Sequence, residues 1–337
     1  MEQRVLGKTG RAASVVGLGT WQLGADWGSV SESDALAVLR AAVESGVTFF
    51  DTADVYGDGR SERVIGRFLA DIYGQGVTVA TKMGRRVAQV PENYTLANFR
   101  AWTDRSRVNL GVDQLDLVQL HCPPTPVFSS DAVYDALDTL VAEERIAAYG
   151  VSVETCDEAL AAIARPGLAT VQIILNAFRR KPLDQVLPAA SAAGVGIIVR
   201  VPLASGLLAA RYTLDTTFAS DDHRTYNRHG EAFDVGETFS GVDYPTGVRA
   251  AAEFAAVAGE PGAFATDPGA AVTTAQAALR WVTQQPGVTT VIPGARDTAQ
   301  AGQNAAAAAL PPLSEHALGQ IEALYDKYLR ADIHSRW

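Results

Sequence analysis

The sequence contains few cysteines, no long apolar run and no segment that looks like a targeting signal. Only Cys122 and Cys156 are present among 337 residues, which is too few for a disulfide framework. The opening MEQRVLGKTG lacks the apolar core of a signal peptide. No apolar run approaches the roughly 20 residues that cross a bilayer. These absences predict a cytoplasmic protein in a reducing environment, with no membrane partner.

The charge balance argues against nucleic acid as a partner. The chain has 38 acidic residues and 28 strong bases, which gives a formal net charge of −10 at pH 7. An acidic chain repels phosphate backbones unless its bases are segregated, and no run of Lys and Arg indicates such a patch. With 47% hydrophobic and 20% charged residues, the chain has ample material for a packed globular core. Its oligomeric state is not readable from the sequence.

Eight short runs rich in Val, Ile and Leu each precede a longer segment of helical period. Their nearly continuous apolar character is typical of parallel strands that are covered on both faces. Strand and helix alternating about every 30 residues predicts a (β/α)₈ TIM barrel, with an open doubly wound sheet as the alternative. The runs are residues 15–18, 47–50, 77–80, 115–120, 148–151, 171–175, 195–199 and 288–292.

Two segments depart from this alternation. A turn at residues 8–10 lies between two brief apolar pieces, which predicts a short N-terminal hairpin that covers the floor of the barrel. Residues 209–269 are too long for an ordinary barrel loop and are rich in acids, Gly, Pro and aromatics. They predict an insertion after the seventh strand that lies over the mouth of the barrel and is helical near residues 248–257. No linker divides the chain, so we expect one domain over residues 1–337.

Polar side chains follow several of the expected strands. In a barrel these strand ends meet at one rim, which is where barrel enzymes place their active sites. The exit residues are Asp51, Lys82, His121, Ser152 and Arg200, after the second, third, fourth, fifth and seventh strands.

Four side chains at this rim fit together as a proton donor. A free tyrosine has a pKa of about 10, and an ammonium group nearby favours its phenolate form. Lys82 beside Tyr56 should therefore lower the pKa of the phenol, and Asp51 should keep Lys82 charged and in place. His121 can donate a hydrogen bond to a substrate carbonyl. No metal is needed for this chemistry, and no set of metal ligands stands at suitable spacing around His121.

Seven motifs span almost the whole chain: GLGTWQLG, FFDTADVYGDGRSE, ATKMG, LDLVQLHCP, AAYGVS, RVPLASGLL and VIPGARDTAQAGQN, in this order. As a set they resemble the aldo-keto reductase family. The resemblance implies a (β/α)₈ barrel that binds a nicotinamide cofactor, usually NADP(H), in extended form at the carboxyl-terminal rim. It implies that Tyr56 is the general acid or base, that Lys82 and Asp51 tune it, and that His121 orients the substrate carbonyl.

The resemblance also implies a set of cofactor contacts. Arg296 and Arg211 are candidates for holding a ribose 2′-phosphate, which favours NADPH with NADH as the alternative. Arg200 stands where the family normally stacks an aromatic residue beneath the nicotinamide, and Val153 stands where many members have Asn. The contacts are Gly19, Thr20, Asp51, Ser152 and Gln172 for the nicotinamide and its ribose, Pro202, Leu203 and Gly206 for the pyrophosphate, and Gly294, Arg296, Gln300, Gln303 and Asn304 for the adenosine end.

These observations predict the reversible reduction of an aldehyde or ketone to an alcohol by hydride transfer. The partner is then a small-molecule carbonyl substrate, whose pocket Trp21 and Trp27 are expected to line. His223 and His229 lie in the polar insertion and are expected to be solvated. Two other functions remain open: a nicotinamide-sensing binding subunit with little turnover, and a metal-dependent barrel hydrolase.

Overall fold

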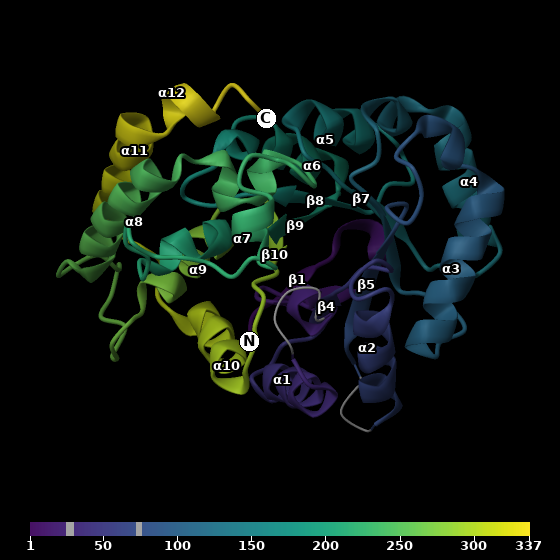
Figure 1. The fold of residues 1–337 in the computed structure, drawn as a ribbon, viewed down its shortest axis with the longest axis horizontal. Coiled ribbons are helices and arrows are strands. Elements are labelled where there is room, and N and C mark those ends of the chain that lie inside the picture. Colours follow the sequence, from purple (N-terminus) through teal and green to yellow (C-terminus); the bar gives the residue numbers. More distant parts are fainter. Residues whose placement is uncertain (25–29, 72–75) are drawn as a thin grey trace.

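The computed structural model describes residues 1–24, 30–71 and 76–337. Eight parallel strands in sequence order form a barrel (Figure 1). Parallel bridges from Val16 to Val291 and from Gly19 to Gly294 join the first strand to the last. The barrel prediction is therefore confirmed. The strands are β3 (Leu18–Gly19), β4 (Phe49–Asp51), β5 (Thr78–Met83), β6 (Leu117–His121), β7 (Tyr149–Ser152), β8 (Thr170–Ile174), β9 (Gly196–Arg200) and β10 (Val288–Val291).

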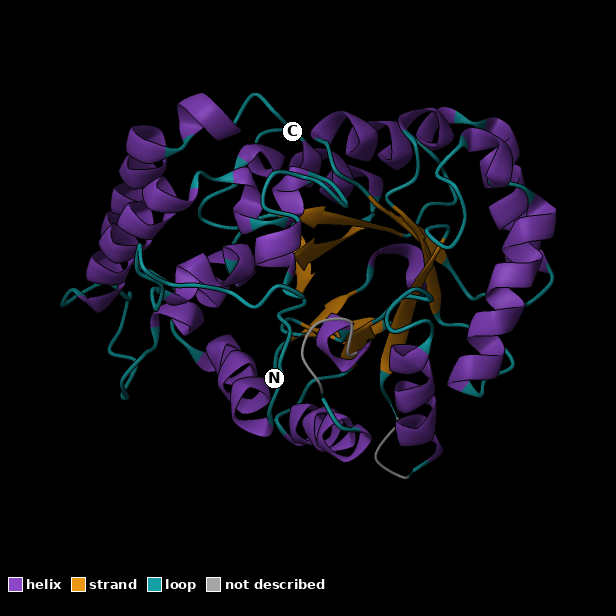
Figure 2. Ribbon diagram, viewed as in Figure 1, coloured by secondary structure: helices purple, strands orange, loops and turns teal. Residues whose placement is uncertain are grey.

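Helices surround the strands on the outside of the barrel (Figure 2). Their starts follow ordinary capping chemistry: the Ser31 hydroxyl accepts from the Asp34 amide, and Thr155 and Glu158 form a reciprocal capping box. No helix of the described residues is long and apolar enough to cross a membrane. The helices between successive strands are α1 (Glu32–Glu44), α2 (Arg60–Ala70), α3 (Leu96–Leu110), α4 (Asp131–Ala142), α5 (Cys156–Ile163), α6 (Val186–Ala193) and α9 (Thr274–Thr283), and α10 (Thr298–Ala306) and α11 (Glu315–Tyr328) follow the last strand.

The N-terminal hairpin is present as expected. Strands β1 (Gln3–Val5) and β2 (Ala12–Ser14) pair antiparallel. Leu6, between them, is fully buried and belongs to a cluster with apolar side chains of the barrel strands, among them Phe49 and Ile198. A Cβ on Gly7 would lie 2.4 Å from the Gly196 amide nitrogen, so the hairpin packs directly on backbone at the amino end of β9. The amino ends of the strands are thereby covered.

The long segment between β9 and α9 is folded rather than open. It contains the 3₁₀ segment η7 (Ala204–Ala209), helix α7 (His223–Tyr226), the 3₁₀ turns η8 (Val235–Glu237) and η9 (Phe239–Gly241), and helix α8 (Tyr244–Gly259). Helix α8 is the helix expected near residues 248–257. It begins earlier because the Asp243 side chain accepts from the Thr246 amide and caps it.

Candidate active site

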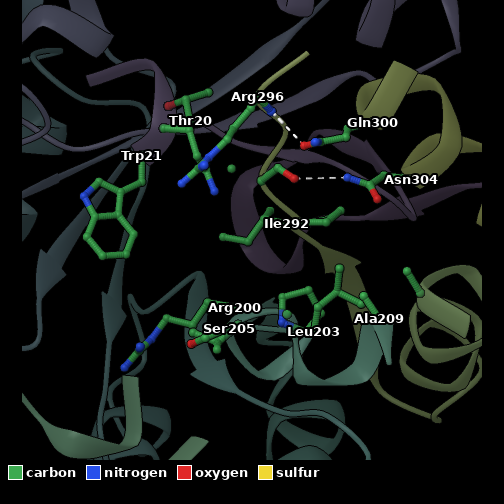
Figure 3. A pocket seen from close by; sticks show the side chains of 18 of the residues that line it. Thr20, Trp21, Arg200, Leu203, Ser205, Ala209, Ile292, Arg296, Gln300 and Asn304 are labelled. Atoms are coloured by element: carbon green, nitrogen blue, oxygen red, sulfur yellow. Dashed lines mark hydrogen bonds between the residues drawn. The ribbon is translucent and has the colours of Figure 1, made fainter. Parts of the chain in front are cut away.

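A pocket of about 440 Å³ opens at the carboxyl ends of the barrel strands (Figure 3). Strands β4, β8 and β9 contribute side chains to its lining: Asp51, Gln172 and Arg200. Parallel strands bring their carboxyl ends to one rim, so residues far apart in sequence meet there. The pocket walls come from the segment after β3, the segment after β10 and the long segment after β9.

Lys82 organises the charged centre beneath the pocket. Its side chain is 1% exposed and forms an ion pair with the Asp51 carboxylate. The same ammonium donates to the carbonyl oxygen of Thr52 at 3.0 Å and to the Tyr56 hydroxyl at 3.3 Å. Strands β4 and β5 are neighbours, so Lys82 crosses directly to the residues that follow β4. Asp51 and Tyr56 line the pocket, whereas Lys82 lies behind them.

Two amides complete the environment of the Asp51 carboxylate. Gln172 Nε2 donates to Asp51 Oδ2 at 2.7 Å, and Gln119 Nε2 donates to the same oxygen at 3.1 Å. Gln172 also donates to Gln119 Oε1 at 3.1 Å. A buried ion pair offsets the cost of its desolvation only when its remaining hydrogen-bonding positions are filled. These amides fill them, and they fix the direction of the carboxylate toward Lys82.

Burial dominates the acidity of Tyr56. It raises the pKa of the phenol above its ordinary value, and the neighbouring Lys82 lowers it only in part. We expected Tyr56 to have a lowered pKa, and this expectation is wrong, because the pKa is raised overall. Lys82 itself does lower the pKa, as expected. Burial also works to lower the pKa of Lys82, but Asp51 and Tyr56 outweigh it and raise the pKa. The site thus holds a protonated phenol beside a charged amine.

His121 ends β6 beside this centre. Its ring centroid lies 6.0 Å from that of Tyr56, edge to face. Burial lowers the pKa of His121 well below its ordinary value, and Arg85, Lys82 and Arg200 lower it further. The imidazole is therefore neutral near pH 7, with one N–H donor. Its Nδ1 has no hydrogen-bond partner within the described residues. His121 is 6% exposed and is not among the residues that line the pocket.

Most of the residues expected to contact a cofactor meet in this pocket. Ser152 does not line it: the side chain is buried and its Oγ accepts from Cys122 Sγ at 3.4 Å. Trp27 lies outside the described residues. The expected residues that line the pocket are Gly19, Thr20, Trp21, Asp51, Tyr56, Gln172, Arg200, Pro202, Leu203, Gly206, Arg211, Gly294, Arg296, Gln300, Gln303 and Asn304.

One end of the pocket is built from the loop after β10 and the start of α10. Gln300 Oε1 accepts from the Arg296 amide at 3.0 Å, and Asn304 Nδ2 donates to the carbonyl of Gly294 at 3.1 Å (Figure 3). Burial lowers the pKa of Arg296, and the nearby positive charge of Arg224 lowers it further. Arg211 lines the same pocket. The Arg224 guanidinium is paired with the Asp222 carboxylate, which offsets part of its repulsion with Arg296. The lining still carries several guanidinium groups, which fits an anionic ligand group.

The sequence did not reveal seven further polar or aromatic lining residues. His223, expected to be solvated, is 4% exposed, and its ring centroid lies 5.1 Å from that of Trp21. Burial lowers its pKa to about 4. His229 is exposed, as expected. Most of these seven residues belong to the segment after β9, whose path no periodicity predicts. They are Gln22, Ser205, Tyr212, His223, Arg224, Glu237 and Thr273.

Arg200 lies in a buried cluster of alternating charge. It donates to Glu154 Oε2 at 2.8 Å, and its other terminal nitrogen lies 3.7 Å from Glu237 Oε2. Arg85 contacts the same two carboxylates, at 3.4 Å and 3.1 Å. Burial raises the pKa of Glu154, whereas Arg85 and Arg200 overcome burial and lower that of Glu237. The two arginines thus share the two acids, and these contacts fix the position of Arg200, which lines the pocket.

The same cluster contains the one group of possible metal ligands found among the described residues. Ligand atoms of Cys122, Glu154 and Glu237 lie within 4.8 Å of one another. Both carboxylates already bind guanidinium groups, which a cation would have to displace. Burial and then Glu154 raise the pKa of the Cys122 thiol to about 12, so the sulfur is protonated and a poor ligand. This donor set favours arginine over a metal ion.

The fold and pocket define a parallel α/β barrel with a small-molecule site at the carboxyl ends of its strands. Known proteins share this arrangement. Aldo-keto reductase YhdN of Bacillus subtilis is 29% identical over 89% of this chain and 86% of its own. A glycerol dehydrogenase from Gluconobacter oxydans superposes with a TM-score of 0.76 at 25% identity, covering 99% and 98% of the two chains. An aldo/keto reductase from Klebsiella pneumoniae, solved with NADP and acetate, superposes with a TM-score of 0.69 at 25% identity over 96% of each chain.

The family assignment follows from a match along most of the sequence. The sequence model of the aldo/keto reductase family matches residues 15–326. The chain belongs to this family, and it is therefore an NAD(P)-dependent oxidoreductase by class.

Proposed function

We propose that the protein reduces an aldehyde or ketone to an alcohol with NADPH, and runs the reverse oxidation with NADP⁺. The observation that carries this proposal is the contact of the buried Lys82 ammonium with both the Asp51 carboxylate and the Tyr56 hydroxyl at the pocket floor. It sets a phenol ready to give its proton to an oxygen in the pocket. A bound NADPH would supply the hydride that the carbonyl carbon receives.

The protein's own groups would move the proton. As the carbonyl oxygen gains negative charge, Tyr56 Oη transfers its proton to it, and the resulting phenolate is stabilised by the charged Lys82 at 3.3 Å. Asp51 keeps Lys82 protonated and fixed. His121 does not itself line the pocket but lies beside Tyr56, with ring centroids 6.0 Å apart. Its neutral imidazole would donate its N–H to a carbonyl oxygen that reaches Tyr56, and so would orient the substrate. Alcohol oxidation uses the same contacts, with the Tyr56 phenolate as the base.

The arginine-lined end of the pocket supports NADPH over NADH as the cofactor. Arg296, Arg224 and Arg211 all line it, and a 2′-phosphate would receive charge-assisted hydrogen bonds there. The Klebsiella pneumoniae relative was solved with NADP. Steady-state kinetics with each cofactor test the assignment, since NADPH should give at least about tenfold higher kcat/KM, roughly one charge-assisted contact. Equal values for NADH and NADPH would refute the phosphate site.

A second candidate function is a cofactor-sensing subunit with little turnover. The fold alone would serve either role. The contacts among Asp51, Lys82 and Tyr56 favour catalysis, because a sensor has no use for a proton donor. Oxidation of NADPH in the presence of a panel of aldehydes, ketones and sugars separates the two. We expect turnover with at least one panel member, and tight NADPH binding without any turnover would favour the sensor.

A further inference from the structure

Trp337, the last residue of the sequence, is packed beneath the turns η8 and η9. Its side chain is buried at 6% exposure. The indole Nε1 donates to Asp234 Oδ1 at 3.0 Å, and the Arg179 guanidinium lies 4.2 Å from the ring centroid. Asp234 Oδ1 also accepts from the Gly236 amide at 2.7 Å. The same oxygen therefore accepts the indole hydrogen bond and caps η8.

The backbone of these turns is shaped to fit the indole. A Cβ on Gly236 would lie 2.9 Å from the Trp337 ring, and a Cβ on Gly241 only 2.2 Å from it. Phe239, Ser240 and Gly241 have successive φ values of 52°, 59° and 74°. Two non-glycine residues in this left-handed region hold such a backbone only when their surroundings impose it. The indole ring is one of those surroundings.

The turns that enclose Trp337 carry a wall of the pocket. Glu237, which ends η8, binds Arg85 and Arg200 through its carboxylate. The Ser205 hydroxyl donates to the Glu237 carbonyl at 3.2 Å and accepts from the Phe239 amide at 3.0 Å. Ser205, Glu237 and Arg200 all line the pocket. Trp337 itself does not line it.

A second route runs through Arg179. Its guanidinium, buried to 2% exposure, stacks on Trp337 and donates to the Glu154 carbonyl at 2.6 Å. Glu154 is the partner of Arg200 at 2.8 Å. The indole therefore supports both acids that hold the Arg200 guanidinium, one through η8 and one through Arg179.

We propose that Trp337 is a positioning residue for the pocket: it holds the η8 turn and Arg179 so that Glu237 and Glu154 fix Arg200 in the pocket wall. The consequence for cofactor affinity rests on the proposed function, whereas the positioning of the turn does not. Loss of the indole frees the turn, lets the Glu237 carboxylate leave the two arginines, and leaves Arg200 free to move within the pocket that it lines.

The experiment compares Trp337→Ala, Trp337→Phe and a control, Ile333→Ala, in the full chain. Ile333 is a buried side chain of α12 (Arg330–Ile333). It takes no part in the indole contacts with Asp234 and Arg179, so its truncation should preserve them. Hydrogen exchange of residues 234–241 is measured without cofactor, and the NADPH Kd is measured by fluorescence titration. Trp337→Ala should speed exchange in this segment and raise the Kd about tenfold or more, equal to about 1.4 kcal/mol. Trp337→Phe keeps an aromatic ring against Arg179, so its exchange rate and its Kd should lie between those of Trp337→Ala and those of the wild type.

The outcomes separate positioning from general destabilisation. Ile333→Ala should lower Tm without changing the exchange of residues 234–241 or the Kd. In a Glu237→Gln background, Trp337→Ala should weaken NADPH binding less than it does alone, since the route through η8 is already broken and only the route through Arg179 remains to be lost. Unchanged exchange in Trp337→Ala, or equal effects from Ile333→Ala, would overturn the proposal. If exchange responds as expected but the wild type binds no NADPH, the proposed function fails while the positioning of the turn stands.

Discussion

Replacement of Lys82 by Met tests the charged centre quantitatively. The substitution keeps a flexible side chain of similar length and removes the ammonium from Asp51, Thr52 and Tyr56. Breaking a buried ion pair by removing one partner costs about 3–5 kcal/mol of stability. Asp51 retains the amide donors of Gln172 and Gln119, so the lower end, about 3 kcal/mol, applies. At roughly 2 °C per kcal/mol, Tm should fall by about 6 °C.

The expected loss of turnover comes from the contact with Tyr56. A hydrogen bond from a charged donor contributes about 1.5–3 kcal/mol, and the contact strengthens as the phenol gives up its proton. A loss of about 2 kcal/mol corresponds to a decrease in kcat of about 30-fold. Without the ammonium the pKa of Tyr56 rises further, so the pH at which oxidation becomes fast should move upward.

The assay combines thermal unfolding, NADPH titration and steady-state turnover in both directions. Gln119→Leu is the matched control, because it removes a donor to Asp51 that does not touch Tyr56. It should cost about 1 kcal/mol of stability and leave the pH profile in place. If Lys82→Met binds NADPH normally and keeps at least about a third of wild-type kcat, a deficit far below the 30-fold expected, the role of Lys82 is refuted.

Two further predictions concern stability. Burial, and then Glu62, raises the pKa of Asp54 to about 7. From about pH 4 to pH 7 the unfolded chain has released this proton while the folded chain keeps it, so the free energy of unfolding falls as pH rises through that window. Above about pH 7 the total loss reaches up to about 4 kcal/mol. Asp54→Asn should therefore raise the urea midpoint at about pH 8 and not at about pH 4, and an equal gain at both would contradict the account. Gly150→Ala would place a Cβ 2.1 Å from Thr170 Oγ1 and 2.8 Å from the Thr170 carbonyl oxygen, forcing β7 and β8 apart. It should lower the free energy of unfolding by about 2–3 kcal/mol, whereas Gly319→Ala, on α11 with nothing within 4 Å of the new Cβ, should raise it slightly.

The strands were predictable because each is an apolar run in an alternating chain. The carboxyl ends of the second, third, fourth, fifth and seventh predicted strands were placed too early. Asp51, Lys82, His121, Ser152 and Arg200 were expected to follow their strands, but each lies within β4, β5, β6, β7 or β9. A prediction from apolar character alone ends each strand before its first polar residue. The barrel interior accepts polar side chains at its carboxyl rim because other side chains and backbone carbonyls satisfy them there, as Gln119 and Gln172 do for Asp51.

The segment after β9 and the cluster around Arg200 were not predictable in detail. Arg85, Glu154, Arg200 and Glu237 come from four separate parts of the chain, and no spacing rule connects them. His223 resembles any polar loop residue in sequence, and only the packing of α7 over Trp21 makes it a pocket residue. The net pKa of Tyr56 was also beyond the sequence, because it depends on how completely the phenol is buried.

Single-turnover kinetics of Tyr56→Phe with bound NADPH test the central claim most directly. The substitution removes only the hydroxyl that contacts Lys82, so NADPH should bind with a Kd within about twofold of wild type, while reduction of a carbonyl substrate should slow by at least about 10³-fold. A Tyr56→Phe variant that binds NADPH and reduces the carbonyl at a rate near that of the wild type would contradict the assignment of Tyr56 as the proton donor.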